Sequence, residues 1–153
     1  EINKIGFDKN NYKSISSRFG KLEASLKVIK KYPILGTGTG DLISELVLIY
    51  KEMNFTAGIK KKYNPHNQFL DNIARNGVLG IVSLVIIYFL PLYVSKKEKD
   101  SFYLSFVLVI IGVSLTESIL DVHKGITFYT FFNTMLFYDI LKDQKINSVN
   151  LRI

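Results

Sequence analysis

His66 and Arg18 are the two residues in this sequence whose types and surroundings best suit chemistry. His66 opens the segment HNQFLDNIARNGVLGI, in which nine residues separate the His-Asn pair from Gly77 and Gly80. A histidine, with a reference pKa of about 6.5, can take a proton from a hydroxyl group at neutral pH. An arginine is permanently charged and offers a planar pair of donors to a phosphate oxygen. The sequence therefore supplies a base and an anion-binding group.

A second group of polar residues is suited to binding a charged substrate; these candidates are Asn67, Arg75, Lys60, Lys61, Lys62 and Glu117. Glu117 is included because a carboxylate beside an apolar run is costly in lipid and more often marks a site or a buried partner. Asp121 and His123 lie in a short turn and are expected to be solvated instead. There is no Asp-x-Asp motif and no His-Glu cluster, so we expect neither a metal nor another cofactor.

The segment YPILGTGTGD follows with glycine at positions 36, 38 and 40. A phosphate-binding loop is one interpretation of these glycines. However, a dinucleotide motif requires G-x-G-x-x-G after a strand, and a Walker loop requires Gly-Lys-Ser/Thr. Neither pattern is present. We therefore expect Pro33, Gly36 and Gly38 to form a turn between two helices.

Three helices and no sheet are expected between a loop at residues 1–17 and residue 77. The first, at about 18–32, has apolar residues at helical spacing and lysines on its other faces, and it ends before Pro33. It could lie along an anionic membrane surface or present a solvated face on a packed helix. The second, at about 42–53, has Asp41 as its N-cap. The third covers about 66–76, with Pro65 in its first turn, and residues 54–64 look like a mobile basic linker.

Two long uncharged runs, at residues 78–94 and 101–116, are separated by the basic block SKKEKD, and a third apolar run covers residues 126–138. This pattern is typical of membrane helices, which need about 17 to 25 residues. We predict an all-α integral membrane bundle fragment with spans at about 78–94, 101–120 and 126–141. A soluble helical protein is the alternative, but so short a chain has too little polar helix to cover three apolar ones.

Basic residues in the short loops predict the orientation of these spans. Residues 95–100 contain three lysines and the tail after residue 138 contains three basic residues, whereas residues 121–125 contain one. By the positive-inside rule, the linker and the tail at 142–153 are cytoplasmic, and residues 1–77 are extracytoplasmic. The 13 basic and 7 acidic residues of that first half do not contradict this, because long loops are translocated largely regardless of charge.

The third helix would place His66 on a defined face just above the membrane surface. On a continuous helix, His66, Leu70, Ile73 and Gly77 lie on one narrow stripe. Gly77 and Gly80 lack side chains, so a neighbouring helix can approach this face closely. We expect this packing to fix the position of His66, and the helix to bend at Gly77 or continue into the first span.

Neither cysteine usage nor the N-terminus identifies the compartment directly. The chain has no cysteine, which excludes disulfides and leaves the redox environment open. EINKIGFDKNNYKS lacks the apolar core of a signal peptide. We therefore expect a piece of a longer membrane protein, inactive without the missing N-terminal helices of the same chain.

Three motifs occur in order along the chain, namely SSRFGKLEASLKVIKKYPILGTGTG, HNQFLDNIARNGVLGI and TESILDVHKGITFYTFFNTMLF. Together they resemble the signatures of the O-antigen ligase and polymerase superfamily. Those signatures are an arginine that opens a helix ending in Pro-x-x-Gly-x-Gly, a His-Asn pair before Gly-x-x-Gly, and a glutamate before the last helix. The chain departs from the family in length, since many upstream membrane helices are missing.

The resemblance implies a metal-independent glycosyltransferase of the bacterial cytoplasmic membrane. It would move a glycan from an undecaprenyl or other polyprenyl diphosphate carrier to a hydroxyl group of a glycan or glycolipid acceptor, outside the membrane. His66 would be the base and Arg18 would bind the diphosphate. The resemblance leaves open whether the protein is a ligase or a polymerase in envelope polysaccharide biosynthesis.

Two other functions remain open. A transporter or flippase fragment would need ionisable residues deep within the spans, and only Glu117 comes near that description. A non-catalytic membrane anchor would use the basic loop to bind lipid, teichoic acid or nucleic acid. Nucleic acid is not expected as a partner, because Phe19 and Tyr32 are better explained by helix packing than by base stacking. The enzyme predicts that His66 and Arg18 converge on one cavity.

Overall fold

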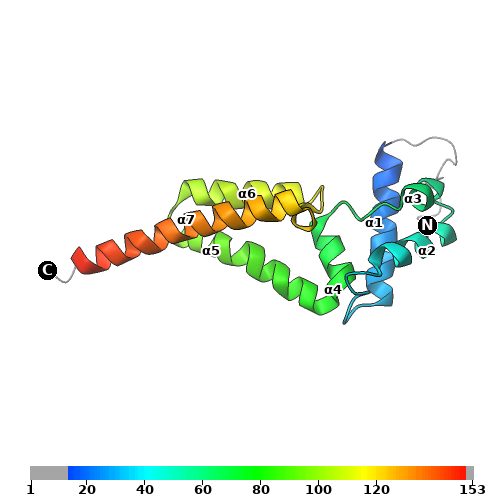
Figure 1. Ribbon diagram of the computed structural model, residues 1–153, viewed down its shortest axis with the longest axis horizontal. Coiled ribbons are helices and arrows are strands. Elements are labelled where there is room, and N and C mark those ends of the chain that lie inside the picture. Colours follow the sequence, from blue (N-terminus) through cyan, green and yellow to red (C-terminus); the bar gives the residue numbers. More distant parts are fainter. Residues whose placement is uncertain (1–13, 151–153) are drawn as a thin grey trace.

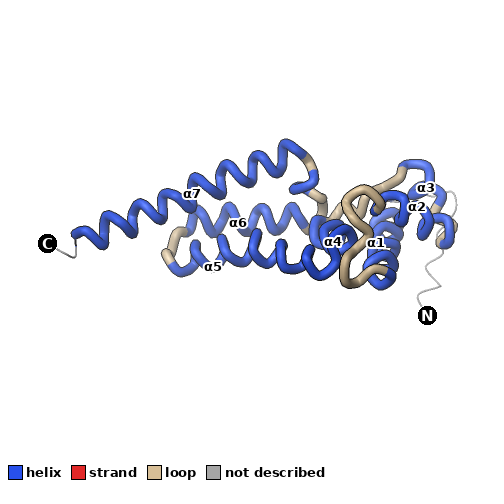
Figure 2. Tube along the Cα trace, turned by 60° about the horizontal axis from the view of Figure 1, so that its bottom comes forward, coloured by secondary structure: helices blue, strands red, loops and turns tan. Residues whose placement is uncertain are grey.

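The computed structural model describes residues 14–150, and this part of the chain consists of helices joined by short loops, without a strand (Figures 1 and 2). In chain order the elements are α1 (Ser14–Lys31), α2 (Leu42–Glu52), α3 (Thr56–Lys61), α4 (Gln68–Leu84), the π-helical η2 (Val85–Phe89), α5 (Leu90–Lys97), α6 (Ser101–Ser114), the 3-10 helix η3 (Ile119–Asp121) and α7 (His123–Asn150). The predicted all-α fold is confirmed. Most of the expected loop at 1–17 lies outside the described residues.

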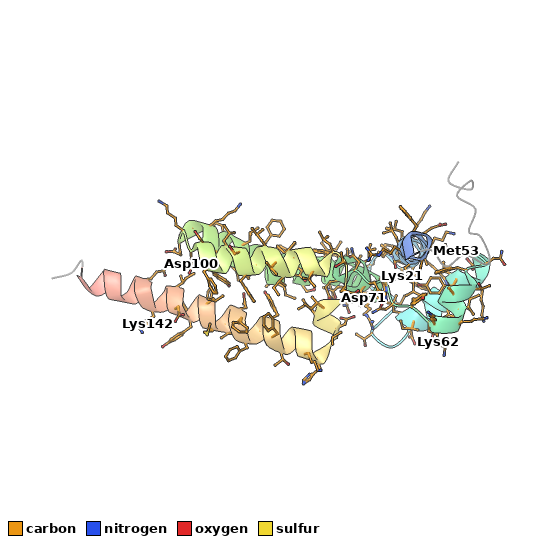
Figure 3. All side chains as sticks on the ribbon, turned by 90° about the horizontal axis from the view of Figure 1, so that it is seen from above. Lys21, Met53, Lys62, Asp71, Asp100 and Lys142 are labelled. Carbon is orange, nitrogen blue, oxygen red and sulfur yellow. The ribbon has the colours of Figure 1, made fainter. Side chains whose placement is uncertain are left out.

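The helices form a head and a bundle. The head contains α1, α2, α3 and the first half of α4, and the bundle contains the rest of α4 with η2, α5, α6 and α7 (Figure 1). α1 runs across the long axis of the bundle, because it stands upright in Figure 1 and is seen end-on in Figure 3. The head has an apolar core of its own, built by Ala24, Val28, Leu42, Leu46, Ile49, Tyr50, Phe55, Ala57 and Ala74.

α1 is the expected basic helix, but it begins at Ser14 and so includes residues that we expected to be loop. It ends at Lys31, two residues before Pro33, because a proline ring cannot continue a helix. Ala24 and Val28 on one face are fully buried in the head core. Lys27, Lys30 and Lys31 remain exposed, whereas Lys21 is buried.

α2 occupies the predicted segment, and Asp41 stands at its N-cap without a side-chain capping bond. α3 replaces part of the expected linker. Two small residues that precede the run of lysines, Ala57 and Gly58, are buried in the head. A Cβ atom on Gly58 would stand 2.6 Å from the ring of Phe55 and 2.7 Å from that of Tyr50. Tertiary packing therefore orders a segment whose composition predicts mobility.

α4 begins at Gln68 rather than at His66, which corrects the predicted start. Asn67 is the N-cap, and its side-chain oxygen accepts a hydrogen bond from the Leu70 backbone N–H at 3.0 Å. His66 has a φ of 48°, in the left-handed region, so it lies outside the helix. The helix starts after Asn67, and not at Asn64-Pro65, because the Asn67 side chain accepts a hydrogen bond from a free backbone N–H of the first turn. The predicted stripe of His66 with Leu70 on a continuous helix is therefore wrong.

The helix bends at Gly77, whose φ of 55° and ψ of −132° are not helical. Before Gly77 the chain runs across the bundle, and after it the chain runs along the bundle (Figure 1). The turn after α1 fills the break through its backbone: Val78 N donates to Ile34 O at 3.0 Å, and Thr37 N donates to Ala74 O at 2.9 Å. The turn after α1 and the bend in α4 are therefore hydrogen-bonded to each other, and we call this contact the glycine joint.

The two glycines at this joint are needed for backbone contact. Gly36 has a φ of 69°, and a Cβ atom there would clash with the carbonyl of Arg75. A Cβ atom on Gly77 would likewise clash with the carbonyl of Ile34. Positive φ and close backbone approach both favour glycine. The YPILGTGTGD glycines therefore support a helix joint, and no strand precedes them in the described residues.

Within the bundle, a π-helical turn accommodates Pro91. A proline in a regular α-helix would clash with the carbonyl four residues earlier, which here belongs to Ile87. The wider turn releases that carbonyl, and the Tyr129 hydroxyl donates to it at 2.6 Å. Two further bonds join the helices, between Tyr88 and Ser114 at 2.7 Å and from Tyr103 to Asn133. Such pairing matters in lipid, where no water replaces a lost partner.

By length and composition, one helix in the described residues could cross a membrane, namely Gln68–Lys97, and α6 is apolar but shorter. The apolar part of the long helix begins at Val78, directly after the bend. Its outer faces carry exposed apolar side chains such as Phe89, as expected of a membrane bundle. The predicted second segment is shorter than expected, since α6 ends at Ser114, whereas α7 extends beyond 126–141 in both directions. Three spans stay a prediction.

Candidate functional site

A cavity of about 460 Å³ lies where the head meets the bundle. Four segments form it: α1, the turn before α4, the first part of α4 and the end of α6. Its lining residues are Arg18, Phe19, Lys21, Leu22, Pro65, His66, Asn67, Leu70, Leu115, Thr116 and Glu117. Four sequence-predicted site residues therefore meet in one place, although the sequence separates them widely: Arg18, His66, Asn67 and Glu117.

The imidazole of His66 is paired with a carboxylate in this cavity. Nδ1 of His66 lies 2.9 Å from Oε2 of Glu117. A carboxylate at neutral pH only accepts hydrogen bonds, so Nδ1 carries the proton and donates it to Glu117. Nε2 is then left with a free lone pair. The arrangement presents a histidine base whose tautomer is fixed by an acidic partner.

Asn67 holds this part of the site together. Its side-chain oxygen caps α4, and its Nδ2 donates to the carbonyl oxygen of Leu115 at 2.9 Å. Leu115 lies just after α6 and two residues before Glu117. One amide therefore fixes the turn that carries His66 to the segment that carries its partner. The geometry assigns Asn67 a positioning role, and its amide is engaged on both sides.

Two cationic side chains of α1 line the cavity beside the histidine. Arg18 is exposed, and Lys21 follows it by three residues, so both lie on the same side of the helix. The Lys21 residue is only 8% exposed. Its ammonium group lies 5.1 Å from the centroid of the Tyr63 ring, a cation–π contact. Figure 3 labels Lys21 at the junction of head and bundle.

Burial lowers the pKa of Lys21, the nearby charge of Glu117 raises it in part, and the charge of Arg18 lowers it further. Within the described residues, no carboxylate forms an ion pair with this ammonium group. Sequence analysis missed Lys21 as a site residue. The signal was its spacing of three from Arg18, which places a second cation on the face of α1 that Arg18 occupies.

Tyr63 supports both Lys21 and His66. Its ring stacks on Phe55 with centroids 6.4 Å apart and meets the His66 ring edge-on at 6.2 Å. Its backbone carbonyl accepts a hydrogen bond from the hydroxyl group of Tyr50 at 3.2 Å. The core of the head is therefore connected to the cavity through one aromatic side chain.

Arg75, a predicted substrate-binding residue, lies outside the cavity lining. Its guanidinium donates to Asp71 at 2.8 Å and to the carbonyl of Thr39 at 2.8 Å, and it lies 3.3 Å from Asp121. Burial and the neighbouring Asp121 raise the pKa of the Asp71 carboxyl to about 7, against the lowering effect of Arg75. Arg75 thus connects the glycine joint to η3.

The remaining predicted residues also lie away from the cavity lining. Lys60 and Lys61 are in the last turn of α3, and Lys62 is its C-cap with a φ of 47°. Of these three, Lys61 approaches the Tyr63 ring, at 5.9 Å from its centroid. Of the predicted motif residues, Gly36, Gly38 and Gly77 build the joint between the α1 turn and α4. Gly80 lies against the backbone of Asn72 across the bend, and Pro33 follows the end of α1.

No three His, Asp or Glu side chains in the described part of the chain come together as the ligands of a metal ion would. The polar groups that the cavity offers are a histidine–carboxylate pair, an amide, a threonine hydroxyl and two cationic side chains. This set suits the activation of a hydroxyl group beside an anionic substrate.

The fold and the cavity define a helical membrane protein with a polar cavity where its head meets the end of its bundle. Residues 1–85 match the family model described as O-antigen ligase, and the chain belongs to this family. It is also 25% identical over 113 residues to the O-antigen ligase of Escherichia coli (strain K12), covering 72% of this chain and 27% of that protein. No solved structure matches the chain.

Proposed function

We propose that this chain is the catalytic head and adjoining membrane part of an enzyme that transfers a glycan from a polyprenyl diphosphate carrier to an acceptor hydroxyl. The observation that carries the proposal is the pairing of His66 with Glu117 in the cavity that Arg18 also lines. The relative from Escherichia coli supports the reaction class by its name. The chain spans about a quarter of that relative's length. The proposed activity is therefore that of the complete protein, including helices outside this chain.

The proposed reaction moves the glycan from the carrier diphosphate to the acceptor oxygen and the acceptor proton to His66. The acceptor oxygen attacks the anomeric carbon of the glycan, and the bond from that carbon to the carrier diphosphate breaks with its electron pair. The acceptor proton passes to Nε2 of His66. Glu117, hydrogen-bonded at Nδ1, stabilises the imidazolium that forms. The products are a new glycosidic bond, the free polyprenyl diphosphate and a protonated His66 that returns its proton to solvent.

Arg18 and Lys21 act on the leaving group. The diphosphate gains negative charge as the glycosidic bond breaks, and preorganised cations near it stabilise that transition state. Arg18 provides a planar donor pair for two oxygens. Lys21, buried and without a carboxylate ion pair in the described residues, provides a point charge at the cavity. Together these cations supply the charge stabilisation, so the reaction needs no metal.

The distribution of basic residues in the short loops supports a membrane position for the chain. We propose that the enzyme is a multi-pass protein of the bacterial cytoplasmic membrane, with the head and the turn at His123 outside and residues 95–100 inside. Cysteine labelling of intact cells tests this directly. A cysteine at Asn64 is expected to react with an impermeant reagent and one at Lys97 to be protected. The opposite pattern would reject the topology.

The activity itself is tested with the full-length protein in proteoliposomes, with a polyprenyl diphosphate-linked glycan, a hydroxyl acceptor and the chelator EDTA. We expect transfer to proceed and polyprenyl diphosphate to be released in equal amount. A requirement for a divalent cation would overturn the metal-independent mechanism. Release of free glycan without acceptor would instead indicate a hydrolase. The acceptor that supports turnover distinguishes a ligase from a polymerase.

A further inference from the structure

α1 carries an exposed apolar stripe in addition to the face that it buries in the head. Phe19, Leu22 and Leu26 are 53%, 40% and 51% exposed. They are spaced by three and four residues, so they lie on one side of the helix. The face that packs in the head is formed by other residues, including Ala24 and Val28. The other described residues therefore leave a large part of this stripe uncovered.

Two more exposed apolar residues lie at the tip of the turn that follows α1. Ile34 is 69% exposed and Leu35 is 77% exposed. The depth of this tip is fixed, because the carbonyl of Ile34 accepts a hydrogen bond from Val78 N at 3.0 Å. Val78 is the first residue of the apolar run of this long helix. The tip is therefore level with the point where that helix becomes fully apolar.

The stripe faces the end of the bundle. α1 runs across the bundle axis (Figures 1 and 3). Phe19 and Leu22 line the cavity together with Leu115 and Glu117, which follow α6 at the end of the bundle nearest the head. If the apolar helix crosses a membrane, α1 lies parallel to the membrane plane with its stripe towards the bilayer.

Charged residues border the stripe on the side away from the cavity. Lys27 and Lys30 are exposed and follow Leu26 closely on the same helix. Lys27 lies 3.0 Å from the Glu23 carboxylate, whereas Lys30 has no ion pair within the described residues. Lysine side chains at the border of an apolar face can extend to the phosphate groups of lipids while their methylene chains stay in the apolar layer. A water-facing helix would not need an apolar face of this kind, and a purely protein-facing one would not need the lysines.

We propose that Phe19, Leu22, Leu26, Ile34 and Leu35 form a lipid-contact face, which rests on the outer surface of the phospholipid bilayer with Lys30 at the lipid phosphates. This face holds the cavity at the level of the lipid headgroups, where the diphosphate of a lipid-linked substrate would lie. The inference depends on a membrane span that begins near Val78. It does not depend on glycan transfer.

Spin-label accessibility in the full-length protein tests the lipid-contact face. The sequence has no cysteine, so single cysteines are introduced at Leu26 and Leu35, after removal of any in the rest of the protein. Lys27 and Thr39, which are exposed neighbours, provide matched control positions. The labelled proteins are reconstituted in bilayers of phosphatidylethanolamine and phosphatidylglycerol. Collision with oxygen reports apolar surroundings, and collision with a water-soluble nickel chelate reports water.

We expect oxygen to exceed the nickel chelate several-fold at positions 26 and 35, and the reverse at positions 27 and 39. Low accessibility to both reagents at 26 and 35 would overturn the proposal, because it would mean that other helices of the chain cover the face. High accessibility to nickel there would also overturn it, because the face would then be in water. A label at Leu22 replaces the one at Leu26 if that variant does not fold. None of these readings uses transfer activity, so failure of the proposed reaction is detected separately.

Discussion

Oε2 of Glu117 lies 2.9 Å from Nδ1 of His66, although the two residues are 51 positions apart in the chain. Glu117 follows the end of α6, and His66 lies in the turn before α4. The amide of Asn67 bonds to the carbonyl of Leu115 and so fixes the distance between these two segments. The catalytic pair that we propose is therefore shared by the head and the bundle, and it forms when the two parts pack.

His66→Ala is expected to lower transfer by about 10² to 10⁴-fold, the usual contribution of a general base. The protein should stay folded, because the side chain is 35% exposed and its loss leaves no buried cavity. The measurement is turnover of the full-length protein in proteoliposomes, with thermal unfolding recorded in parallel. His123→Ala is the matched control, since His123 is the other histidine of the sequence and is exposed. Near-normal turnover of His66→Ala would make His66 structural.

Glu117→Gln separates the charge of the partner from its hydrogen bond. A glutamine can still accept the proton of Nδ1 through its oxygen, but it cannot stabilise an imidazolium by charge. We expect kcat to fall by roughly 10 to 100-fold while KM for the donor changes little. Glu117→Ala should be at least as damaging, because the tautomer is then no longer fixed. Unchanged kcat in both variants would show that the pair has no part in proton transfer.

Lys21→Met is expected to make the folded protein more stable and its transfer activity lower. Burial lowers the pKa of Lys21 in the folded state, so at neutral pH the folded protein carries the cost of a desolvated charge. Between the folded pKa and the unfolded value of about 10.4 the unfolded state binds more protons, and stability rises with pH. The advantage of the Met variant in thermal unfolding should therefore shrink as pH rises towards 10. Lys21→Arg is the control for charge.

Transfer provides the second readout for Lys21. Lys21→Met should raise KM for the diphosphate-linked donor or lower kcat, and Lys21→Arg should restore part of the loss by returning the charge. A Met variant with normal kinetics would remove Lys21 from the site and leave it as a buried contact of Tyr63. A Met variant that is less stable at neutral pH would contradict the desolvation argument itself.

The glycine joint predicts a stability difference between neighbouring glycines. Gly36→Ala and Gly77→Ala each place a Cβ atom against backbone and at positive φ. We expect each to cost roughly 2 kcal/mol or more. Gly40→Ala is the control, because nothing lies within 4 Å of a Cβ atom there. Thermal unfolding of the three variants tests this difference. Equal melting temperatures would show that Gly36 and Gly77 do not contact backbone as described.

Local patterns in the sequence were enough to predict the helices that have regular apolar spacing, but not the features that depend on packing. α2 and the apolar start of the bundle at Val78 follow from spacing and charge alone. α3 did not, because its order comes from burying Gly58 against the rings of Tyr50 and Phe55. The start of α4 was also misplaced, since the capping bond of Asn67 competes with the proline signal before it.

The candidate site was predicted by residue type but not by geometry. Arg18, His66, Asn67 and Glu117 do meet in one cavity. Lys21 was missed because a lysine on a basic helix looks like one of several solvated charges. Its burial depends on how α1 packs against the turn at Tyr63, which no local pattern contains.

Arg75 provides the last prediction, because its geometry argues for a structural role although its type suits a phosphate. Its guanidinium bonds to Asp71, which is fully buried, and to the carbonyl of Thr39 in the glycine turn. Arg75→Met removes this partner and is expected to cost about 3 kcal/mol, the usual loss when one member of a buried ion pair is deleted. Because the Asp71 carboxyl has its pKa raised to about 7, the folded state binds more protons than the unfolded state between about pH 4 and 7. Wild-type stability relative to Asp71→Asn should therefore fall as pH rises through that window. The measurements are thermal unfolding from pH 4 to 8 and KM for the donor at pH 7. A raised KM in a fully stable Arg75→Met variant would place Arg75 on the substrate instead.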